Sequence, residues 1–186
     1  MFTALLDTNV LVPIALADTL LRVAERGLFV PLWSASILSE LREALVVVRS
    51  DLPEPRIDAR LEAMQHQFPD AAVEGYESLI DDVQLPDTKD RHVVAAGVRG
   101  KATVIVTANI KDFPRTALLA FGLEAVSPDR FLCDLLDLFP NVMLEILTEQ
   151  SAALHTSLHG SVDVLASLQR SGVPDFVAEI KPRFER

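Results

Sequence analysis

The chain has 186 residues, of which 49% are hydrophobic and 24% charged, and a net charge of −10. This profile indicates a globular protein with one well-buried core and excludes a disordered chain. No apolar run reaches the roughly 18 residues of a membrane span, no signal peptide is visible, and the single Cys133 excludes an internal disulfide. We therefore expect a soluble cytoplasmic protein that does not enter membranes. The acidic charge argues against passive binding of nucleic acid through a basic surface, although a nuclease can be acidic where its carboxylates hold cations.

In the N-terminal half, short apolar strands alternate with segments of helical spacing. The predicted elements, in order, are a strand over 3–7, a helix over 10–26, a strand over 28–32, a helix that starts after Ser34 and a helix over 56–68. Ser34 is typical of a helix N-cap, and Glu40 lies inside the helix that it opens.

The second half opens with a helix start, because Pro86 precedes Asp87 and Asp90 follows three residues later. The predicted elements after this helix are a β-branched strand over 102–107, a loop over 109–113, a strand over 123–126 and a helix opened by Ser127 and Pro128. From residue 131 onward the pattern is helical only. Strands that alternate with helices predict an α/β fold with a parallel sheet and right-handed crossovers.

Acidic and amide residues stand where these strands end or where helices begin. They are Asp7 after the first strand, Asp87 and Asp90 at a helix start, and Asn109 and Asp112 after the strand over 102–107. The carboxyl ends of parallel strands line one crevice, so these residues are expected to converge there. Glu40 reaches the same crevice if its helix packs beside the first strand.

Convergence of carboxylates requires a counter-charge. Two carboxylates about 5 Å apart repel by about 3 kcal/mol, so three of them would cost about 10 kcal/mol, comparable to the stability of a whole domain. Either at least one pKa is raised or a divalent cation neutralises the site. Oxygen ligands with no Cys or His nearby favour Mg²⁺ or Mn²⁺ over zinc.

Four segments resemble the motifs of PIN-domain nucleases and occur in the family's order. They are Leu6-Asp7-Thr8-Asn9-Val10, Ser39-Glu40-Leu41, the stretch from Asp87 to Ala96, and the stretch from Val106 to Phe113. The resemblance to the VapC class implies a PIN-like three-layer α/β/α fold over residues 1–130 with a C-terminal helical extension over 131–186. It also implies a Mg²⁺- or Mn²⁺-dependent endoribonuclease, the toxin of a toxin–antitoxin pair, which forms a homodimer and binds a cognate antitoxin.

The same resemblance assigns roles to individual residues. The metal ligands are expected to be Asp7, Glu40 and Asp90, with Asp87 as a further candidate. Asn109 or Asp112 is expected to complete the catalytic set. Residues that orient the ligands through hydrogen bonds are expected to be Thr8, Asn9 and Thr107, and candidates for contacts to RNA are Lys89, Arg91, Lys111 and Arg115.

Several alternatives remain open. An N-cap role explains Asp87 fully, and Asn109 stands where many relatives carry aspartate, which leaves room for a non-catalytic PIN-like module that binds RNA or protein. A phosphatase of the haloacid-dehalogenase type is disfavoured because it needs an aspartate where this chain has Asn9. His92 is interpreted as a residue that packs or hydrogen-bonds at the helix surface, because nothing near it in the sequence makes it a catalytic base.

The resemblance also predicts where a partner binds. Leu11, Ile14, Leu20 and Leu21 lie in helical segments that PIN toxins use for dimer or antitoxin contacts, so we expect an exposed apolar groove. The alternative is that all four face the core.

Overall fold

The computed structural model describes residues 2–157 and 164–184, and the chain divides into two compact units. Unit 1 comprises Met1–Val12 and Phe29–Val126, and unit 2 comprises Pro13–Leu28 and Ser127–Arg186. Each unit therefore combines two stretches that are separate in the sequence. The helical pattern expected over 131–186 includes residues 158–163, which lie outside the described residues. The division of the chain at residue 130 stays a prediction.

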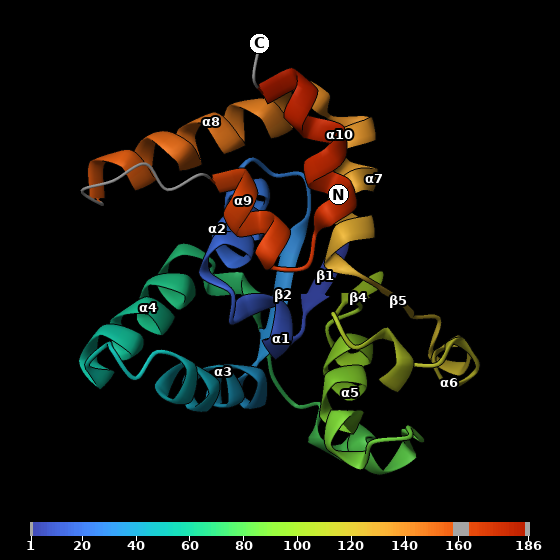
Figure 1. The fold of residues 1–186 in the computed structure, drawn as a ribbon. Coiled ribbons are helices and arrows are strands. Elements are labelled where there is room, and N and C mark those ends of the chain that lie inside the picture. The colour runs from blue at the N-terminus through green and yellow to red at the C-terminus, as the bar shows by residue number, and fades with distance from the viewer. Residues whose placement is uncertain (1, 158–163, 185–186) are drawn as a thin grey trace. The chain divides into compact units, whose positions relative to one another are not determined.

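Unit 1 contains a five-stranded sheet in which every neighbouring pair is parallel (Figure 1). Its strands are β1 (Thr3–Leu6), β2 (Val30–Ser34), β3 (Ala72–Val73), β4 (Val104–Val106) and β5 (Glu124–Val126). The spatial order is β3-β2-β1-β4-β5, so β1 is central. The predicted fold class, α/β with a central parallel sheet and a C-terminal helical region, is confirmed.

The central strands are apolar on both faces, which is what a parallel sheet covered by helices requires. Leu5 and Ile105 are 0% exposed and lie side by side in the register of β1 and β4. The helices of unit 1 are α1 (Thr8–Leu11), α3 (Ala35–Val48), α4 (Glu54–Gln67), α5 (Arg91–Arg99) and α6 (Arg115–Leu118). Short 3-10 turns connect them: η1 (Pro69–Ala71), η2 (Glu77–Asp82), η3 (Thr88–Asp90), η4 (Ile110–Asp112) and η5 (Leu119–Phe121).

Two local signals position the helices that carry site residues. Ser34 caps α3, because its hydroxyl oxygen accepts a hydrogen bond from the backbone N–H of Ile37 at 3.2 Å, as predicted. At Gly100, where α5 ends, a Cβ atom would lie 2.8 Å from a methyl carbon of Val73. Glycine at this position therefore allows α5 to end close against the sheet.

The helix predicted over 10–26 is two helices, α1 and α2 (Ile14–Glu25). Pro13 stands between them with extended backbone, φ −69 and ψ 115, and is the N-cap position of α2. A proline interrupts helical hydrogen bonding because it has no backbone N–H. The other differences are smaller: the strand predicted over 28–32 lies two residues later, and the two-residue β3 was not predicted.

Unit 2 is helical throughout its described residues. It contains α2, α7 (Pro128–Leu138), α8 (Pro140–Ser157), α9 (Val164–Arg170) and α10 (Pro174–Phe184). α2 packs against α8 and α9, and α7 packs against α10. A buried polar pair joins α2 to α8, because the Thr19 hydroxyl lies 2.8 Å from Gln150 Oε1 and the Gln150 amide donates to the Ala15 carbonyl at 2.9 Å.

This packing corrects the predicted apolar groove. Leu11 and Leu20 are both 0% exposed, so the prediction is wrong for these two residues, whereas Ile14 is 46% exposed. The reason is packing. Leu11 lies in the core of unit 1, and α2, which carries Leu20, packs against α8 and α9. None of the described helices is long and apolar enough to cross a bilayer.

Candidate active site at the carboxyl end of the sheet

The candidate site lies where β1 and β4 end side by side. The chain runs outward from β1 through β2 to β3 and then crosses back to β4, so the order of the strands reverses between β1 and β4. Crevices at such reversals are where open α/β sheets bind ligands. Asp7 follows β1 and Thr107 follows β4, and the backbone N–H of Asp7 donates to the Val106 carbonyl at 3.1 Å.

Asp7 is 6% exposed and is held by hydrogen bonds to both carboxylate oxygens. Oδ1 accepts from the backbone N–H of Thr8 at 2.7 Å, and Oδ2 accepts from the Thr107 hydroxyl at 2.7 Å and from the Asn9 amide. Burial raises the pKa of this carboxyl, and the charge of Glu40 raises it further, while the hydrogen bonds lower it in part. The net shift is upward, so the folded protein disfavours the charged form of Asp7.

A small polar network ties the two strand ends together. The Asn9 amide donates to the Thr107 hydroxyl oxygen at 3.0 Å, and Asn9 Oδ1 accepts from the backbone N–H of Ala108 at 2.8 Å. The Thr107 hydroxyl also accepts from the backbone N–H of Asn109 at 3.1 Å. Asn9 and Thr107 therefore both contact Asp7, which they were predicted to orient.

Glu40 is held from two other elements. The Thr8 hydroxyl on α1 donates to Oε2 at 2.8 Å, and Nε2 of His92 on α5 lies 2.9 Å from Oε1. The side chain of Glu40 is 44% exposed, whereas that of His92 is 12% exposed. From the sequence, His92 is interpreted as packing or hydrogen-bonding at the helix surface, and its hydrogen bond is made to Glu40. The expectation that no histidine lies near the oxygen ligands is wrong. The sequence held no local signal for this contact, because the two residues are 52 positions apart.

Asp90 directly precedes α5 and makes no capping hydrogen bond with its side chain. Its pKa is raised to about 6, first by burial and then by the negative charges of Asp7, Asp87 and Asp112. The expectation that at least one carboxylate has a raised pKa is confirmed. Burial contributes more to both shifts than the mutual repulsion on which the expectation was based.

The remaining acidic and amide candidates differ in surroundings. Asp87 caps η3, because Oδ1 accepts from the backbone N–H of Lys89 at 2.9 Å, and its charge also acts on Asp90. The negative charge of Asp112 also raises the pKa of Asp90. The side chain of Asn109 is exposed to solvent. Within residues 2–157 and 164–184, no three His, Cys, Asp or Glu side chains form a group that could hold a metal ion. The predicted ligands do interact by charge, because Glu40 raises the pKa of Asp7, and Asp7, Asp87 and Asp112 raise that of Asp90.

The basic residues predicted to contact RNA surround the same motifs. Lys89, Lys111 and Arg115 are exposed, and none of them forms a salt bridge with a described residue. Arg91 is partly buried and its Nη2 donates to Gln84 Oε1 at 3.4 Å. Its Nε is buried and has no partner among the described residues.

The chemistry of these donors suits a hard divalent cation, although in this structure no three of the described side chains are grouped closely enough to hold one. Asp7, Glu40, Asp90 and Asp112 offer carboxylate oxygens, which Mg²⁺ and Mn²⁺ prefer. Two of these carboxyls have raised pKa values, to which neighbouring negative charges contribute. A bound cation would relieve this repulsion.

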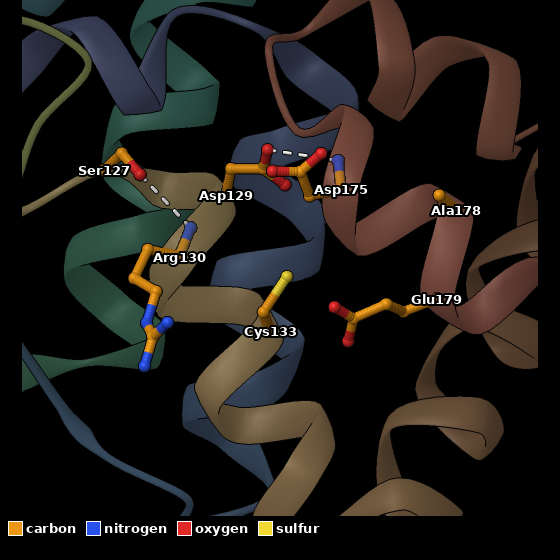
Figure 2. A pocket seen from close by; sticks show the side chains of 7 residues that line it. All are labelled: Ser127, Asp129, Arg130, Cys133, Asp175, Ala178 and Glu179. Atoms are coloured by element: carbon orange, nitrogen blue, oxygen red, sulfur yellow. Dashed lines mark hydrogen bonds between the residues drawn. The ribbon is translucent and has the colours of Figure 1, made fainter.

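An acidic cavity of about 310 Å³ lies within unit 2 (Figure 2). Its lining residues are Ser127, Asp129, Arg130, Cys133, Asp175, Ala178 and Glu179. Here Asp129 accepts hydrogen bonds from the backbone N–H groups of Asp175 at 3.1 Å and Phe176 at 2.8 Å, at the start of α10. Burial, followed by the charges of Glu179 and other acids, raises the pKa of the Cys133 thiol to about 12. The cavity therefore holds a satisfied helix cap and a protonated thiol.

Comparisons with known proteins match both parts of the chain. Residues 3–111 match the family model of the PIN domain, and residues 128–182 match that of the VapC50 C-terminal domain. A relative from Mycobacterium tuberculosis, named "Putative ribonuclease VapC50", is 38% identical over 99 residues. This region covers 52% of the present chain and 56% of the relative, so the match spans about half of each. No solved structure matches the chain.

Proposed function

This chain belongs to the PIN-domain family, and on that basis we propose that it is a Mg²⁺- or Mn²⁺-dependent endoribonuclease that acts as the toxin of a toxin–antitoxin pair. The observation that carries the proposal is the placement of Asp7, Glu40 and Asp90 around the reversal between β1 and β4, with the pKa of Asp90 raised to about 6. Asp7 and Glu40 both accept hydrogen bonds, whereas the side chain of Asp90 makes no capping hydrogen bond, so a cap role does not account for Asp90.

In this proposal Asp7, Glu40 and Asp90 hold the ion. Asp112 completes the set in preference to Asn109, because its charge acts on Asp90. The bound ion would supply Lewis-acid activation of the attacking water and of the scissile phosphate. Thr107 and Asn9 fix the orientation of Asp7 by hydrogen bonds, so that its oxygens are presented with little loss of entropy on binding.

The exposed cations provide the contacts to substrate. Lys89, Lys111 and Arg115 follow or precede acidic residues of the site and remain free of salt bridges with described residues. They would contact phosphates along the RNA backbone and bring it to the carboxylates, although the chain as a whole carries a net charge of −10.

The proposed partners and location come from the same family resemblance. We further propose a cognate antitoxin, a homodimer and a cytoplasmic location, which the resemblance to the VapC class implies. The match of residues 128–182 to the VapC50 C-terminal domain supports that resemblance. Contacts to such partners would use surfaces other than Leu11 and Leu20, since both are buried.

Cleavage of a mixed RNA pool tests the proposal. We expect cleavage with Mn²⁺ or Mg²⁺, none with a chelator, and background activity for Asp7→Asn, which removes one ligand charge at constant size. Asp129→Asn removes one charge from unit 2 and should cleave like wild type. Binding of RNA without cleavage would support the alternative, a non-catalytic PIN-like module, which Asn109 favours by replacing the usual aspartate.

A second pair of variants tests which residue completes the set. Asp112→Asn should weaken Mn²⁺ binding, whereas Asn109→Asp should leave it unchanged, because Asn109 is exposed. A calorimetric titration in which only Asn109→Asp alters the affinity would reverse the assignment.

A further inference from the structure

His92 makes a contact that the roles assigned so far do not use. It lies two residues after Asp90, on the first turn of α5, and its Nε2 is 2.9 Å from Glu40 Oε1. A carboxylate can only accept hydrogen bonds, so Nε2 is the donor. The other ring nitrogen, Nδ1, is buried and has no hydrogen-bond partner among the described residues. Among the described residues, the imidazole of His92 therefore forms its hydrogen bond with Glu40.

The two side chains differ in how firmly they are held. His92 is 12% exposed and sits on a helix that packs against β1, β2 and β4, whereas Glu40 is 44% exposed. A half-exposed glutamate has several accessible rotamers, and ordering it costs conformational entropy. His92 restricts Oε1, and the Thr8 hydroxyl restricts Oε2 at 2.8 Å. Two donors from separate helices therefore fix one carboxylate.

We propose that His92 is a positioning residue that holds the Glu40 carboxylate in the orientation required to bind the divalent ion. The inference rests on the proposed function, because it assigns Glu40 to the ion. Each carboxylate oxygen has two lone pairs, so Glu40 can keep its bonds to His92 and Thr8 while it binds an ion. Loss of such an outer hydrogen-bond partner typically weakens metal binding by about 10–100-fold.

A packing role for His92 makes the opposite prediction. If the ring only filled space, an apolar residue of similar size would serve as well, and it would remove the buried Nδ1 that has no partner. His92→Leu should then keep or raise the melting temperature and leave metal affinity unchanged. The positioning role predicts weaker metal binding in a protein that is still folded.

Calorimetric titration with MnCl₂ separates the two roles. We expect His92→Leu to bind Mn²⁺ about 10–100-fold more weakly than wild type, and His92→Gln to recover most of the affinity, because its amide nitrogen can take the place of Nε2. His92→Asn is too short to reach Glu40 and should bind weakly. His66→Leu, which changes an exposed histidine on α4 in the same unit, should bind like wild type.

A double-mutant cycle with Glu40→Gln identifies the path of the effect. In the Glu40→Gln background, His92→Leu should cause no further loss, because the carboxylate that it positions is gone. If His92→Leu does not fold, the Mn²⁺ affinities of His92→Gln and His92→Asn test the inference instead. Equal affinities of these two variants would overturn it. Equal Mn²⁺ affinity of wild type and His92→Leu would overturn it while leaving the ribonuclease proposal intact. A wild-type protein that binds no Mn²⁺ would overturn both.

Discussion

Acidic side chains gather in both units of this molecule, but the fold treats them differently. In unit 2, Asp129 accepts two backbone N–H groups at the start of α10, where the helix dipole also favours a negative charge. In unit 1, Asp90 makes no capping hydrogen bond and its pKa is raised to about 6. The number of carboxylates is therefore a poor indicator of a cation site. What separates Asp129 from Asp90 is whether the protein already supplies hydrogen-bond donors to the carboxylate.

The largest expected effect concerns the thiol of Cys133, which lines the unit 2 cavity. Its pKa is raised from 9.0 to about 12, and only the thiolate reacts. Alkylation by iodoacetamide at pH 8 should therefore be slower in the folded protein than in urea, on the order of a hundred- to a thousandfold. Mass spectrometry over time measures both rates. Equal rates would mean that the folded protein does not raise the pKa of Cys133, and the contrast between the two acidic regions would fail.

The next effect is stabilisation by metal. A divalent ion that binds only the folded chain stabilises it by about 2.7 kcal/mol at a hundredfold excess over the dissociation constant, which raises the melting temperature by roughly 5–10 °C for a chain of this size. Asp90→Asn should shrink this increment and raise the metal-free melting temperature, because it removes a charge that the fold disfavours. Differential scanning calorimetry with and without MnCl₂ measures both.

Asp129→Ala is the matched control for that experiment. It should lower the melting temperature and leave the Mn²⁺ increment unchanged, because Asp129 belongs to the unit 2 cap. If Asp90→Asn instead lowered the metal-free melting temperature, Asp90 would be a structural cap like Asp129. Asp7→Asn is less suited to this test, because the new amide would face the donor groups that Asp7 now accepts from.

A smaller effect is expected from pH. The pKa of Asp90 is raised from 3.8 to about 6, so between these values the folded protein binds a proton that the unfolded chain does not. This group therefore adds stability to the metal-free protein as the pH falls through that window and removes it as the pH rises. Mn²⁺ affinity should fall by about tenfold per pH unit below pH 6, because a proton must leave before the ion binds. Titrations of wild type and Asp90→Asn at pH 5 and 7 measure the difference, which should be smaller in the variant but not absent, because the pKa of Asp7 is raised as well.

The smallest effect is the loss of the unit 2 cap itself. Asp129→Ala removes two hydrogen bonds from the start of α10 and should cost about 1 kcal/mol, or roughly 2–4 °C in melting temperature. Urea unfolding measures it. A loss of more than a few kcal/mol would show that the charge of Asp129 does more than cap one helix, and the two acidic regions would then be less different than their hydrogen bonds indicate.

Much of unit 1 could be predicted from the sequence, because the signals are local. The apolar run before Asp7 gives a buried strand, Ser34 gives a helix N-cap, and β-branched residues up to Val106 give another strand. The predicted site residues follow from the same signals, since the carboxyl ends of parallel strands share an edge. The interruption at Pro13 was also visible in the sequence, but the helical spacing of the residues around it outweighed the proline.

Tertiary structure alone decided the contacts on which the site depends. The sequence determined that Asp7, Glu40 and Asp90 stand at strand ends or on helices, because helix and strand periodicity arise from neighbours a few residues apart. It did not determine that Glu40 meets His92, that Asp112 acts on Asp90, or that residues 13–28 pack with the C-terminal helices. These contacts join residues that are distant in the chain, and they depend on how whole helices pack, which no local pattern encodes. The same packing left Asp90 with a raised pKa and gave Asp129 two backbone donors.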